Sequence, residues 1–467
     1  MVKKVFLCGI AGTGMSALAG LFKQQGYEVS GSDQRFYPPV DRLLADLQVT
    51  LFQGFAAKNI PADVDFCIIG NAISRGNPEA EHILDQGLEY FSMAEALQRF
   101  FIKGKQSLVV AGSHGKTTTA SFVAHLLNVA GLRPGFFIGG KPANFAANYQ
   151  LAAGDYFVSE GDEYETAFFD RSAKFFKYRP DLLLITALEH DHIDFYRTAE
   201  SYLQSFKNLV NQVPGRGQII VNFDYEMARQ AVSRSFTPVI SYGRAGADFE
   251  ITNMRPGRGG YDFGLENGGR SQKFHSPLAG PYNVWNLTAG IILARELGLP
   301  EEVVGKALAS FGGVERRLSS LGRLQNTIFI EDFAHHPTAI AQVLGGLPDT
   351  YPGRRIVAIF EPRSWSLRRN FFQGLLPASL GHADEIVIKD VFEKDKIPAG
   401  ERLDTGALQA ELEAMGKKVH VCADYDEIKR FVGTMDFSRQ QVVILLSNGD
   451  VRDFTAWVKA LCEKKRN

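Results

Sequence analysis

The sequence predicts an α/β protein of three domains whose sheets are mostly parallel. The chain has 467 residues, 45% of them hydrophobic and 22% charged, which is the composition of a globular protein with about three domains. Apolar, strand-like runs alternate with helical patterns along most of its length, and this alternation is typical of parallel sheets covered by helices on both faces. Two glycine-rich turns each join an apolar run to a helical pattern, and the first of them begins a βαβ unit.

Composition excludes several classes of partner and site. The formal net charge is −1 and the pI is near 6.8, so no overall field attracts nucleic acid or an anionic membrane. No apolar run approaches the roughly 20 residues of a membrane-spanning helix. The cysteines lack any C-x-x-C spacing, which argues against a zinc site or disulfides and favours a cytoplasmic protein. They are Cys8, Cys67, Cys422 and Cys462.

The first domain is expected over residues 1–104. It starts as strand, glycine-rich turn, helix and strand, with Gly26 closing the helix, and it ends at a polar stretch over residues 103–106. The expected elements are strands over Val5–Cys8, Glu28–Ser32 and Phe66–Ile69, and helices over Met15–Gln25 and Ala94–Phe101.

The second domain is expected over residues 105–318. It opens with a strand, a glycine-rich loop and a helix whose apolar residues fall on one face. Residues 253–272 are rich in glycine and charge, so they are expected to form a β-hairpin or loop at the edge of the domain. The other expected elements are strands over Ser107–Val110, Tyr156–Ser159, Leu182–Thr186 and Gln218–Val221, and a helix over Val284–Leu297.

The third domain is expected over residues 319–467, after a boundary near Arg317–Ser320. It repeats the alternation of strands and helices, so a third, mostly parallel sheet is expected. The expected strands are Thr327–Ile330, Ile356–Phe360, Glu385–Ile388, Lys418–Val421 and Val442–Leu446.

The glycine-rich loop of the second domain has the pattern of a phosphate-binding loop, Gly112-Ser113-His114-Gly115-Lys116-Thr117-Thr118. A preceding strand and a following helix are the context that this motif needs. The loop amides and the helix N-terminus would bind phosphate oxygens, Lys116 would reach the β- and γ-phosphates, and Thr117 would ligate Mg²⁺. Val110 stands where a full Walker motif has its first glycine, so the loop is a shortened form.

Two polar segments follow strands of the same domain. They are Ser159-Glu160-Gly161-Asp162-Glu163 and Glu189-His190-Asp191-His192-Ile193-Asp194. Open α/β sheets bind ligands at the carboxyl ends of their strands, and Mg²⁺ prefers oxygen ligands. Either segment alone is more typical of a solvated loop, but their joint placement predicts a metal site beside the phosphate loop.

The first glycine turn, Gly9-Ile10-Ala11-Gly12-Thr13-Gly14, is similar to a dinucleotide-binding fingerprint. Asp33 lies 19 residues beyond Gly14, where it could bind a ribose diol. The spacing is G-x-x-G-x-G rather than G-x-G-x-x-G. A diphosphate of a nucleotide sugar would suit this turn as well as NAD, and a purely structural turn is a third interpretation.

Taken together, these segments resemble the Mur ligase family, the ATP-dependent enzymes that build the peptide stem of bacterial peptidoglycan on UDP-N-acetylmuramate. The resemblance spans nearly the whole chain. It implies a Rossmann-like N-terminal domain for the UDP sugar, a central P-loop ATPase domain, and a Rossmann-like C-terminal domain for the amino substrate. Besides the segments above, the matching motifs are Ser32-Asp33, Gly280-Pro281-Tyr282-Asn283-Val284-Trp285-Asn286, Arg316-Arg317 and Asp332-Phe333-Ala334-His335-His336-Pro337.

Within the family, the chain is more similar to the members that return a recovered tripeptide to UDP-N-acetylmuramate than to those that add L-alanine. Alanine-adding members usually have Gln-Pro-His-Arg where Glu361-Pro362-Arg363-Ser364 stands. The implied reaction, part of peptidoglycan recycling, joins the amine of L-Ala-γ-D-Glu-meso-diaminopimelate to the lactyl carboxylate through an acyl phosphate. Ligation of L-alanine is the alternative. The other segments that carry this similarity are Tyr37-Pro38-Pro39, Gly70-Asn71-Ala72-Ile73-Ser74-Arg75-Gly76-Asn77-Pro78 and Ser447-Asn448-Gly449.

The resemblance also implies roles for single residues. Lys116, Glu160 and His192 would be catalytic, Thr117 and Glu160 would hold one Mg²⁺, and His192 with Glu160 would lie near a second. The general base stays open among His192, His335 and His336. The remaining assignments are Gly112 to Thr118, Asn283, Asn286, Arg317 and Asp332 for ATP; Gly9, Gly12, Thr13, Gly14, Asp33, Asn71 and Ser74 for the UDP sugar; and Arg363, Ser364 and His336 for the amino substrate.

Three residues depart from the family pattern. Tyr282 replaces a histidine that commonly precedes Asn283, and Ala187 replaces an asparagine two residues before Glu189. Lys207 lies 15 residues after His192, where related ligases carry a carbamylated lysine, but the tripeptide-adding members do not reliably have a lysine there.

Two other classes of function remain open from the sequence. An NAD-dependent oxidoreductase would use the first glycine turn but would leave the phosphate loop unexplained. A P-loop switch or motor is disfavoured, because two α/β domains flank the ATPase and no partner-binding tail is present. Only small-molecule substrates are expected, with a monomer or weak homo-oligomer.

Overall fold

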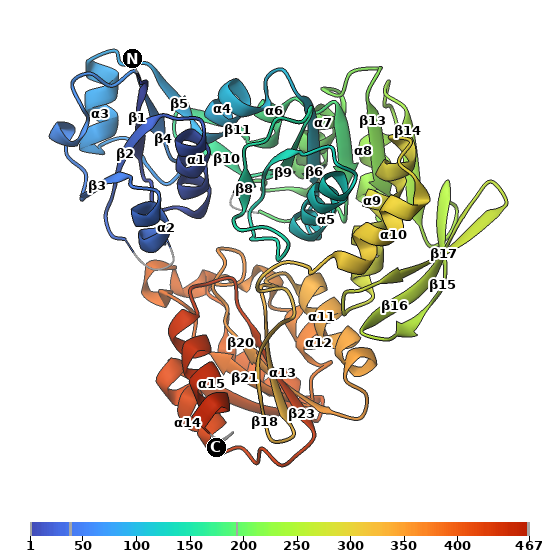
Figure 1. The fold of residues 1–467 in the computed structure, drawn as a ribbon. Helices are drawn as coiled ribbons and strands as arrows, with labels where there is room; N and C mark the ends of the chain where they lie inside the picture. The colour runs from blue at the N-terminus through green and yellow to red at the C-terminus, as the bar shows by residue number, and fades with distance from the viewer. Residues whose placement is uncertain (1, 37–39, 193–194, 465–467) are drawn as a thin grey trace. The chain divides into compact units, whose positions relative to one another are not determined.

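The computed structural model describes residues 2–36, 40–192 and 195–464 (Figure 1). Tyr37-Pro38-Pro39 and the last two residues of the second polar segment, Ile193 and Asp194, lie outside the described residues. The chain forms two compact units. The first comprises Met1–Thr252, Gly264–Gln272 and Trp285–Gly313; the second comprises Asn253–Phe263, Lys273–Val284 and Val314–Asn467. The domain boundaries expected after residues 104 and 318 stay predictions.

The first unit begins with a parallel five-stranded sheet in the order β3-β2-β1-β4-β5. Its inner strand β4, Phe-Cys-Ile-Ile, is buried throughout, as expected of a strand covered on both faces. The helix predicted over Ala94–Phe101 is α4 followed by a wider helical turn over Gln98–Ile102. The elements are β1 (Lys4–Cys8), α1 (Thr13–Gln24), β2 (Glu28–Asp33), α2 (Val40–Asp46), β3 (Thr50–Gln53), β4 (Phe66–Ile69), α3 (Pro78–Asp85), β5 (Tyr90–Ser92) and α4 (Met93–Leu97).

The second sheet has the order β17-β16-β15-β14-β13-β12-β6-β9-β7-β8. The four strands predicted in this domain are present, and residues 253–272 form parts of β15, β16 and β17. A separate two-stranded hairpin is formed by β10 (Glu165–Ala167) and β11 (Asp170–Ala173). The strands of this sheet and the helices between them are, in chain order, β6 (Gln106–Ala111), α5 (Lys116–Val129), β7 (Gly135–Phe137), β8 (Tyr149–Gln150), β9 (Tyr156–Gly161), α6 (Phe175–Tyr178), β12 (Leu182–Ile185), α7 (Ala199–Val210), β13 (Gln218–Asn222), α8 (Glu226–Val232), β14 (Val239–Gly243), β15 (Phe249–Gly257), β16 (Gly260–Asn267), β17 (Arg270–Ser276), α9 (Tyr282–Glu296) and α10 (Glu301–Ser310).

The order of the central strands positions the candidate site. β6, which leads into the phosphate loop, lies between β9 and β12 and is parallel to both. The first polar segment begins with the last three residues of β9 and runs past its end, and the second follows β12. The register pairs Val110 with Glu160 and Ala111 with both Gly161 and Ile185. The loop and both polar segments therefore leave the sheet at one edge, as the sequence predicts.

The first two sheets share one hydrophobic core. Val5 and Leu7 of β1 and Val109 and Ala111 of β6 belong to the same buried cluster. A loop connection adds to it, because the backbone N–H of Leu151 donates to the Gln24 side chain at 2.8 Å. This shared core explains why the N-terminal sheet and the central sheet form one unit.

The second unit contains a six-stranded sheet in the order β18-β19-β23-β20-β21-β22, antiparallel only between β18 and β19. The strand β18 was not predicted. α14 and α15 pack on one face through Ile428, Val432, Phe454 and Val458, and α11 and α12 lie on the opposite side (Figure 1). The elements are β18 (Ser319–Leu324), β19 (Thr327–Asp332), α11 (Pro337–Thr350), β20 (Arg355–Phe360), α12 (Leu376–Leu380), β21 (Glu385–Lys389), α13 (Thr405–Ala414), β22 (Lys418–Cys422), α14 (Tyr425–Gly433), β23 (Gln441–Leu446) and α15 (Arg452–Lys464). Among the described helices of the whole chain, none is both long and apolar enough to cross a bilayer.

Candidate active site

The phosphate loop connects β6 to α5 through backbone that is fixed at both sides. The Ser113 N–H donates to the Ala187 carbonyl at 2.7 Å, and the Thr186 hydroxyl donates to the His114 carbonyl at 2.5 Å. Gly115 caps α5 with φ of +82° and provides no side-chain acceptor for the first helical amides. Such amides, together with the helix dipole, form an anion-binding site. Ala187 departs from the family pattern, but it contacts the loop through its backbone carbonyl, so this hydrogen bond does not depend on its side chain.

Gly115 has a steric as well as a conformational constraint. A Cβ atom there would overlap Oδ1 of Asn286 on α9, which brings one predicted ATP residue against the loop. Gly115→Ala is therefore expected to lower the free energy of unfolding by more than about 1 kcal/mol and to reduce ATP-dependent turnover. Urea unfolding and steady-state kinetics measure the two effects.

Gly131→Ala is the matched control, because Gly131 has φ of +77° but open space around an added Cβ. It is expected to show the backbone strain alone and to leave turnover unchanged. Equal losses of stability in the two variants would show that the contact with Asn286 has no energetic consequence.

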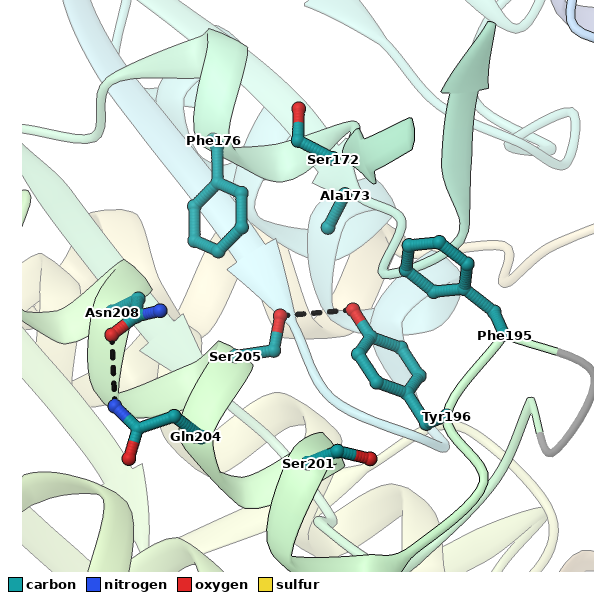
Figure 2. Close-up of a pocket in the computed structure, with 9 residues that line it drawn as sticks. All are labelled: Ser172, Ala173, Phe176, Phe195, Tyr196, Ser201, Gln204, Ser205 and Asn208. Carbon is teal, nitrogen blue, oxygen red and sulfur yellow. Dashed lines mark hydrogen bonds between the residues drawn. The ribbon is translucent and has the colours of Figure 1, made fainter. Parts of the chain in front are cut away.

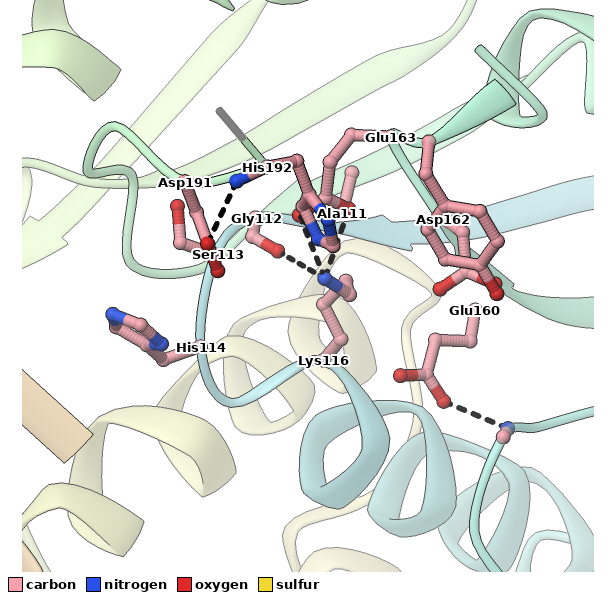
Figure 3. Close-up of polar contacts among 12 residues, drawn as sticks. Ala111, Gly112, Ser113, His114, Lys116, Glu160, Asp162, Glu163, Asp191 and His192 are labelled. Atoms are coloured by element: carbon pink, nitrogen blue, oxygen red, sulfur yellow. Dashed lines mark hydrogen bonds and ion pairs between the residues drawn. The ribbon is translucent and has the colours of Figure 1, made fainter. Parts of the chain in front are cut away.

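Lys116 is held by a partner that the sequence did not identify. Its ammonium donates to the Gly112 carbonyl at 2.6 Å and to both carboxylate oxygens of Glu163, at 2.9 and 3.1 Å (Figure 3). Glu163 is fully buried. Burial alone raises the pKa of Glu163, but Lys116 and then His192 lower it to about 2. Burial likewise lowers the pKa of Lys116, and Glu163 with the other nearby carboxylates raises it above its usual value. Both groups are therefore ionised at neutral pH.

Glu163 also positions His192 and Tyr202. His192 Nε2 lies 3.3 Å from one carboxylate oxygen, and the Tyr202 hydroxyl donates to the same oxygen at 3.3 Å. Burial lowers the pKa of His192, but the Glu163 carboxylate raises it to about 9. The Tyr202 hydroxyl also bonds Ser113 at 2.9 Å, so α7 connects Glu163 to the phosphate loop.

Glu160 and Thr117 form a second polar group at the start of α5. The Thr117 hydroxyl donates to one Glu160 oxygen at 2.8 Å, and the Gly139 N–H donates to the other at 2.8 Å. Both side chains are buried. Burial and Asp162 raise the pKa of Glu160, and Lys116 offsets part of this rise. A hydroxyl and a carboxylate that converge beside a phosphate loop are oxygen donors of the kind Mg²⁺ prefers, so these residues fit the predicted cation.

The neighbouring acids and Lys207 have other surroundings. Asp162 accepts a hydrogen bond from the Tyr164 hydroxyl at 2.7 Å. Lys207 is half-buried on α7, and its carbamylation stays a prediction. A cavity of about 300 Å³ lies beside α7, where the Tyr196 hydroxyl bonds Ser205 at 2.8 Å (Figure 2). None of its lining residues is among the predicted site residues.

The first glycine turn is closed around the end of β2. The N–H groups of Gly9 and Ile10 donate to the Ser32 carbonyl at 2.9 and 3.0 Å, and the Ala11 N–H donates to the Asp33 carboxylate at 2.9 Å. α1 begins at Thr13 with Gly12 as its cap and no capping side chain. Asp33 thus braces the turn, while its role toward a ribose stays a prediction.

A cavity of about 430 Å³ lies beside this turn. It is lined by Gln34, Phe55 and residues 72–78, including the predicted Ser74. Glu79, fully buried just behind it, accepts hydrogen bonds from the Ser32 hydroxyl at 2.5 Å and from the Asn59 amide at 2.7 Å. No sequence pattern singles out Glu79, which the structure places in the first turn of α3.

In the second unit, Asp332 ends β19 and is buried. It accepts from the N–H groups of Leu318 and Ala334, both at 2.8 Å. Burial raises the pKa of Asp332, and Arg317 partly opposes that rise. The Asn283 side chain donates to the Ala279 carbonyl at 2.6 Å. Arg317 and Asp332 therefore interact electrostatically, while their contacts with ATP stay predictions.

The predicted amino-substrate residues lie at the carboxyl end of β20 and the start of α11. Arg363 stacks on the Phe392 ring at 4.0 Å. The Ser364 hydroxyl accepts from the Leu367 N–H at 3.2 Å, which makes it a turn-forming residue. His336 caps α11, since its Nδ1 accepts from the Thr338 N–H at 3.3 Å. Their contacts with a substrate stay predictions.

Comparison with known proteins gives a consistent result along the whole chain. Three family models match: the Mur ligase family catalytic domain over residues 4–104, the Mur ligase middle domain over 110–294, and the Mur ligase glutamate ligase domain over 316–449.

Individual relatives carry two kinds of name. The UDP-N-acetylmuramate–L-alanyl-gamma-D-glutamyl-meso-2,6-diaminoheptandioate ligase of Escherichia coli (strain K12) is 37% identical over 82% of this chain and 84% of its own length. The UDP-N-acetylmuramate–L-alanine ligase of Aquifex aeolicus (strain VF5) is 32% identical over 94% of this chain and 96% of its own. The crystal structure of a murein peptide ligase from Psychrobacter arcticus 273-4 superposes with a TM-score of 0.73 and 27% identity, covering 99% of this chain and 98% of the other.

Proposed function

This chain belongs to the Mur ligase family and is an ATP-dependent amide ligase, and from that premise we propose that it joins a murein tripeptide to UDP-N-acetylmuramate. The tripeptide is L-Ala-γ-D-Glu-meso-diaminopimelate, and the reaction belongs to peptidoglycan recycling in the cytoplasm. Support comes from the greater identity to the tripeptide ligase, 37% against 32% for the alanine ligase. The match to the L-alanine ligase covers more of this chain, 94% against 82%, so ligation of L-alanine is the second candidate.

The geometry that carries the proposal is the ionised Lys116 at the phosphate loop, beside the Glu160–Thr117 pair. A carboxylate is a poor electrophile, so ATP must first convert the lactyl carboxylate into an acyl phosphate. Phosphoryl transfer depends on positioning and charge stabilisation, which Lys116 and the amides at the start of α5 would supply. Thr117 and Glu160 would hold Mg²⁺, and when bound this ion would neutralise charge on the β- and γ-phosphates.

The later step uses the amino substrate. Its free amine attacks the acyl carbon, and the tetrahedral intermediate collapses to the amide with release of phosphate; ADP is the other product. In this proposal the N-terminal sheet, with the first glycine turn and the cavity over residues 72–78, binds the UDP sugar, and Arg363, Ser364 and His336 serve the amine-bearing peptide.

The decisive experiment compares amines. The protein is incubated with ATP, Mg²⁺ and UDP-N-acetylmuramate, and phosphate release is followed with the tripeptide, with L-alanine, or with neither. Release with the tripeptide at a kcat/KM well above that for L-alanine is expected. Release with L-alanine alone would replace the tripeptide by the second candidate, and no amine-dependent release would overturn the proposed function.

A further inference from the structure

A buried carboxylate marks the carboxyl ends of three neighbouring strands in the second unit. Glu361 follows β20, Lys389 ends β21 and Ser447 follows β23. Glu361 is only 1% exposed. Its Oε2 accepts from the Ser447 hydroxyl at 2.6 Å and from the Tyr425 hydroxyl at 2.8 Å. Two donors on one oxygen fix this carboxylate in place.

The other oxygen of Glu361 faces two cations at longer range. Arg363 Nη1 lies 3.5 Å from Oε1, and Lys389 Nζ lies 3.6 Å from it. Within the described residues, Oε1 has no hydrogen-bond partner. The cations are thus held by charge rather than by direct hydrogen bonds. Their side chains remain 25% and 13% exposed, so both can donate toward solvent.

The acids nearest in sequence to these cations have other partners. Asp390 pairs with Lys394 at 2.5 Å. Glu393 pairs with Lys396 at 2.8 Å. Lys389 and Arg363 share the buried carboxylate of Glu361; Glu393, Asp424 and Asp450 also interact with them electrostatically. Because ligands of α/β sheets bind at the carboxyl ends of strands, the partly exposed cations are placed to meet an anion.

We propose that Lys389, together with Arg363, binds a carboxylate of the peptide substrate, and that Glu361 is the positioning residue that holds the two cations in place. The inference rests on the proposed function and identifies a residue that determines its substrate specificity. In L-alanine the only carboxylate is adjacent to the reacting amine. The tripeptide carries further carboxylates on the residues beyond its alanine, and these can reach a cationic site away from the reacting centre.

Gly449 supports this arrangement. A Cβ atom at Gly449 would overlap the Arg363 side chain, so the glycine gives the guanidinium its path along the strand end. The Gly449 N–H donates to the Ser447 hydroxyl at 3.0 Å, and that hydroxyl donates to Glu361. The backbone beside β23 therefore fixes both Arg363 and the carboxylate that it faces.

The test compares Lys389→Met with Lys396→Met, a matched change at an exposed ion-paired lysine. Each variant and the wild type are assayed with the tripeptide and with a tripeptide whose diaminopimelate carboxylates are carboxamides. The wild type is expected to lose about 10- to 100-fold in kcat/KM on the amide, the usual effect of removing a charged hydrogen bond. Lys389→Met is expected to lose a similar factor on the acid through KM and to discriminate little between acid and amide.

Lys389→Arg keeps the charge and is expected to restore the preference for the acid, whereas Lys396→Met should behave as wild type. Thermal unfolding checks that each variant is folded. If Lys389→Met prefers the acid as strongly as the wild type, or if it raises the KM of ATP or the UDP sugar instead, the inference is overturned while the proposed function stands. A wild-type protein without tripeptide-dependent phosphate release would overturn the proposed function and this inference with it.

Discussion

Replacement of Lys116 by methionine is expected to reduce kcat/KM by at least about 100- to 1,000-fold, because one of the main charge-stabilising donors of phosphoryl transfer is lost. UDP-sugar affinity should stay nearly unchanged, since the first glycine turn lies in a different sheet from the phosphate loop. Coupled phosphate release and calorimetric titration with UDP-N-acetylmuramate measure the two quantities. A comparable loss of affinity for ATP and for the UDP sugar would contradict the assignment of separate sites.

The same substitution leaves a buried anion with one cationic partner fewer. Glu163 would keep His192 at 3.3 Å, but removal of one member of a buried ion pair commonly costs about 3–5 kcal/mol. The double variant Lys116→Met/Glu163→Gln removes both charges and is the control. It should recover stability in urea unfolding without recovering activity, which separates the catalytic effect from unfolding.

Glu160→Gln is expected to lower turnover by at least about 100-fold and to raise the Mg²⁺ concentration needed for half-maximal rate. Glutamine can still accept the Gly139 N–H and can donate to Thr117, so the shape of the site is preserved. Because burial raises the pKa of Glu160, its neutral isostere should leave the stability unchanged or slightly increased. Metal titrations of the rate and thermal unfolding provide the measurements.

Glu165→Gln serves as the comparison, since Glu165 is partly exposed and ion-paired with Arg171. It should retain the wild-type dependence on Mg²⁺. If Glu160→Gln also retains it, Glu160 does not bind the cation.

The parallel core of each sheet was predictable because its strands are continuous apolar runs. Leu-Leu-Leu-Ile in β12 and Val-Val-Ile-Leu-Leu in β23 are buried almost throughout. Because both faces of these strands are covered, no polar residues interrupt the apolar runs, and the runs are easily recognised in the sequence. β18, Ser-Ser-Leu-Gly-Arg-Leu, was missed because only Leu321 and Leu324 are buried. As an edge strand it depends on pairing with β19 more than on its own sequence.

In the candidate site, the sequence predicted which backbone segments come together. It did not predict which side chains pair, because that depends on the direction in which each side chain points. The phosphate loop and the two polar segments follow from strand order. The pairing of Glu163 with Lys116 does not, because Asp162 and Glu163 lie beyond the end of β9, where the alternation of side chains no longer applies. Tyr202 was likewise inaccessible to sequence reasoning, since only the packing of α7 brings its hydroxyl to the loop.

The bonds made by Lys116 have a consequence for how nucleotide enters. An ammonium group has three N–H donors, and the three acceptors on Lys116 are the Gly112 carbonyl and the two oxygens of Glu163. ATP cannot simply add to this lysine; its phosphate oxygens must displace an acceptor that is already there. Nucleotide binding is thus an exchange of acceptors on Lys116, and a weakly charged anion that cannot outcompete Glu163 gains little from this lysine.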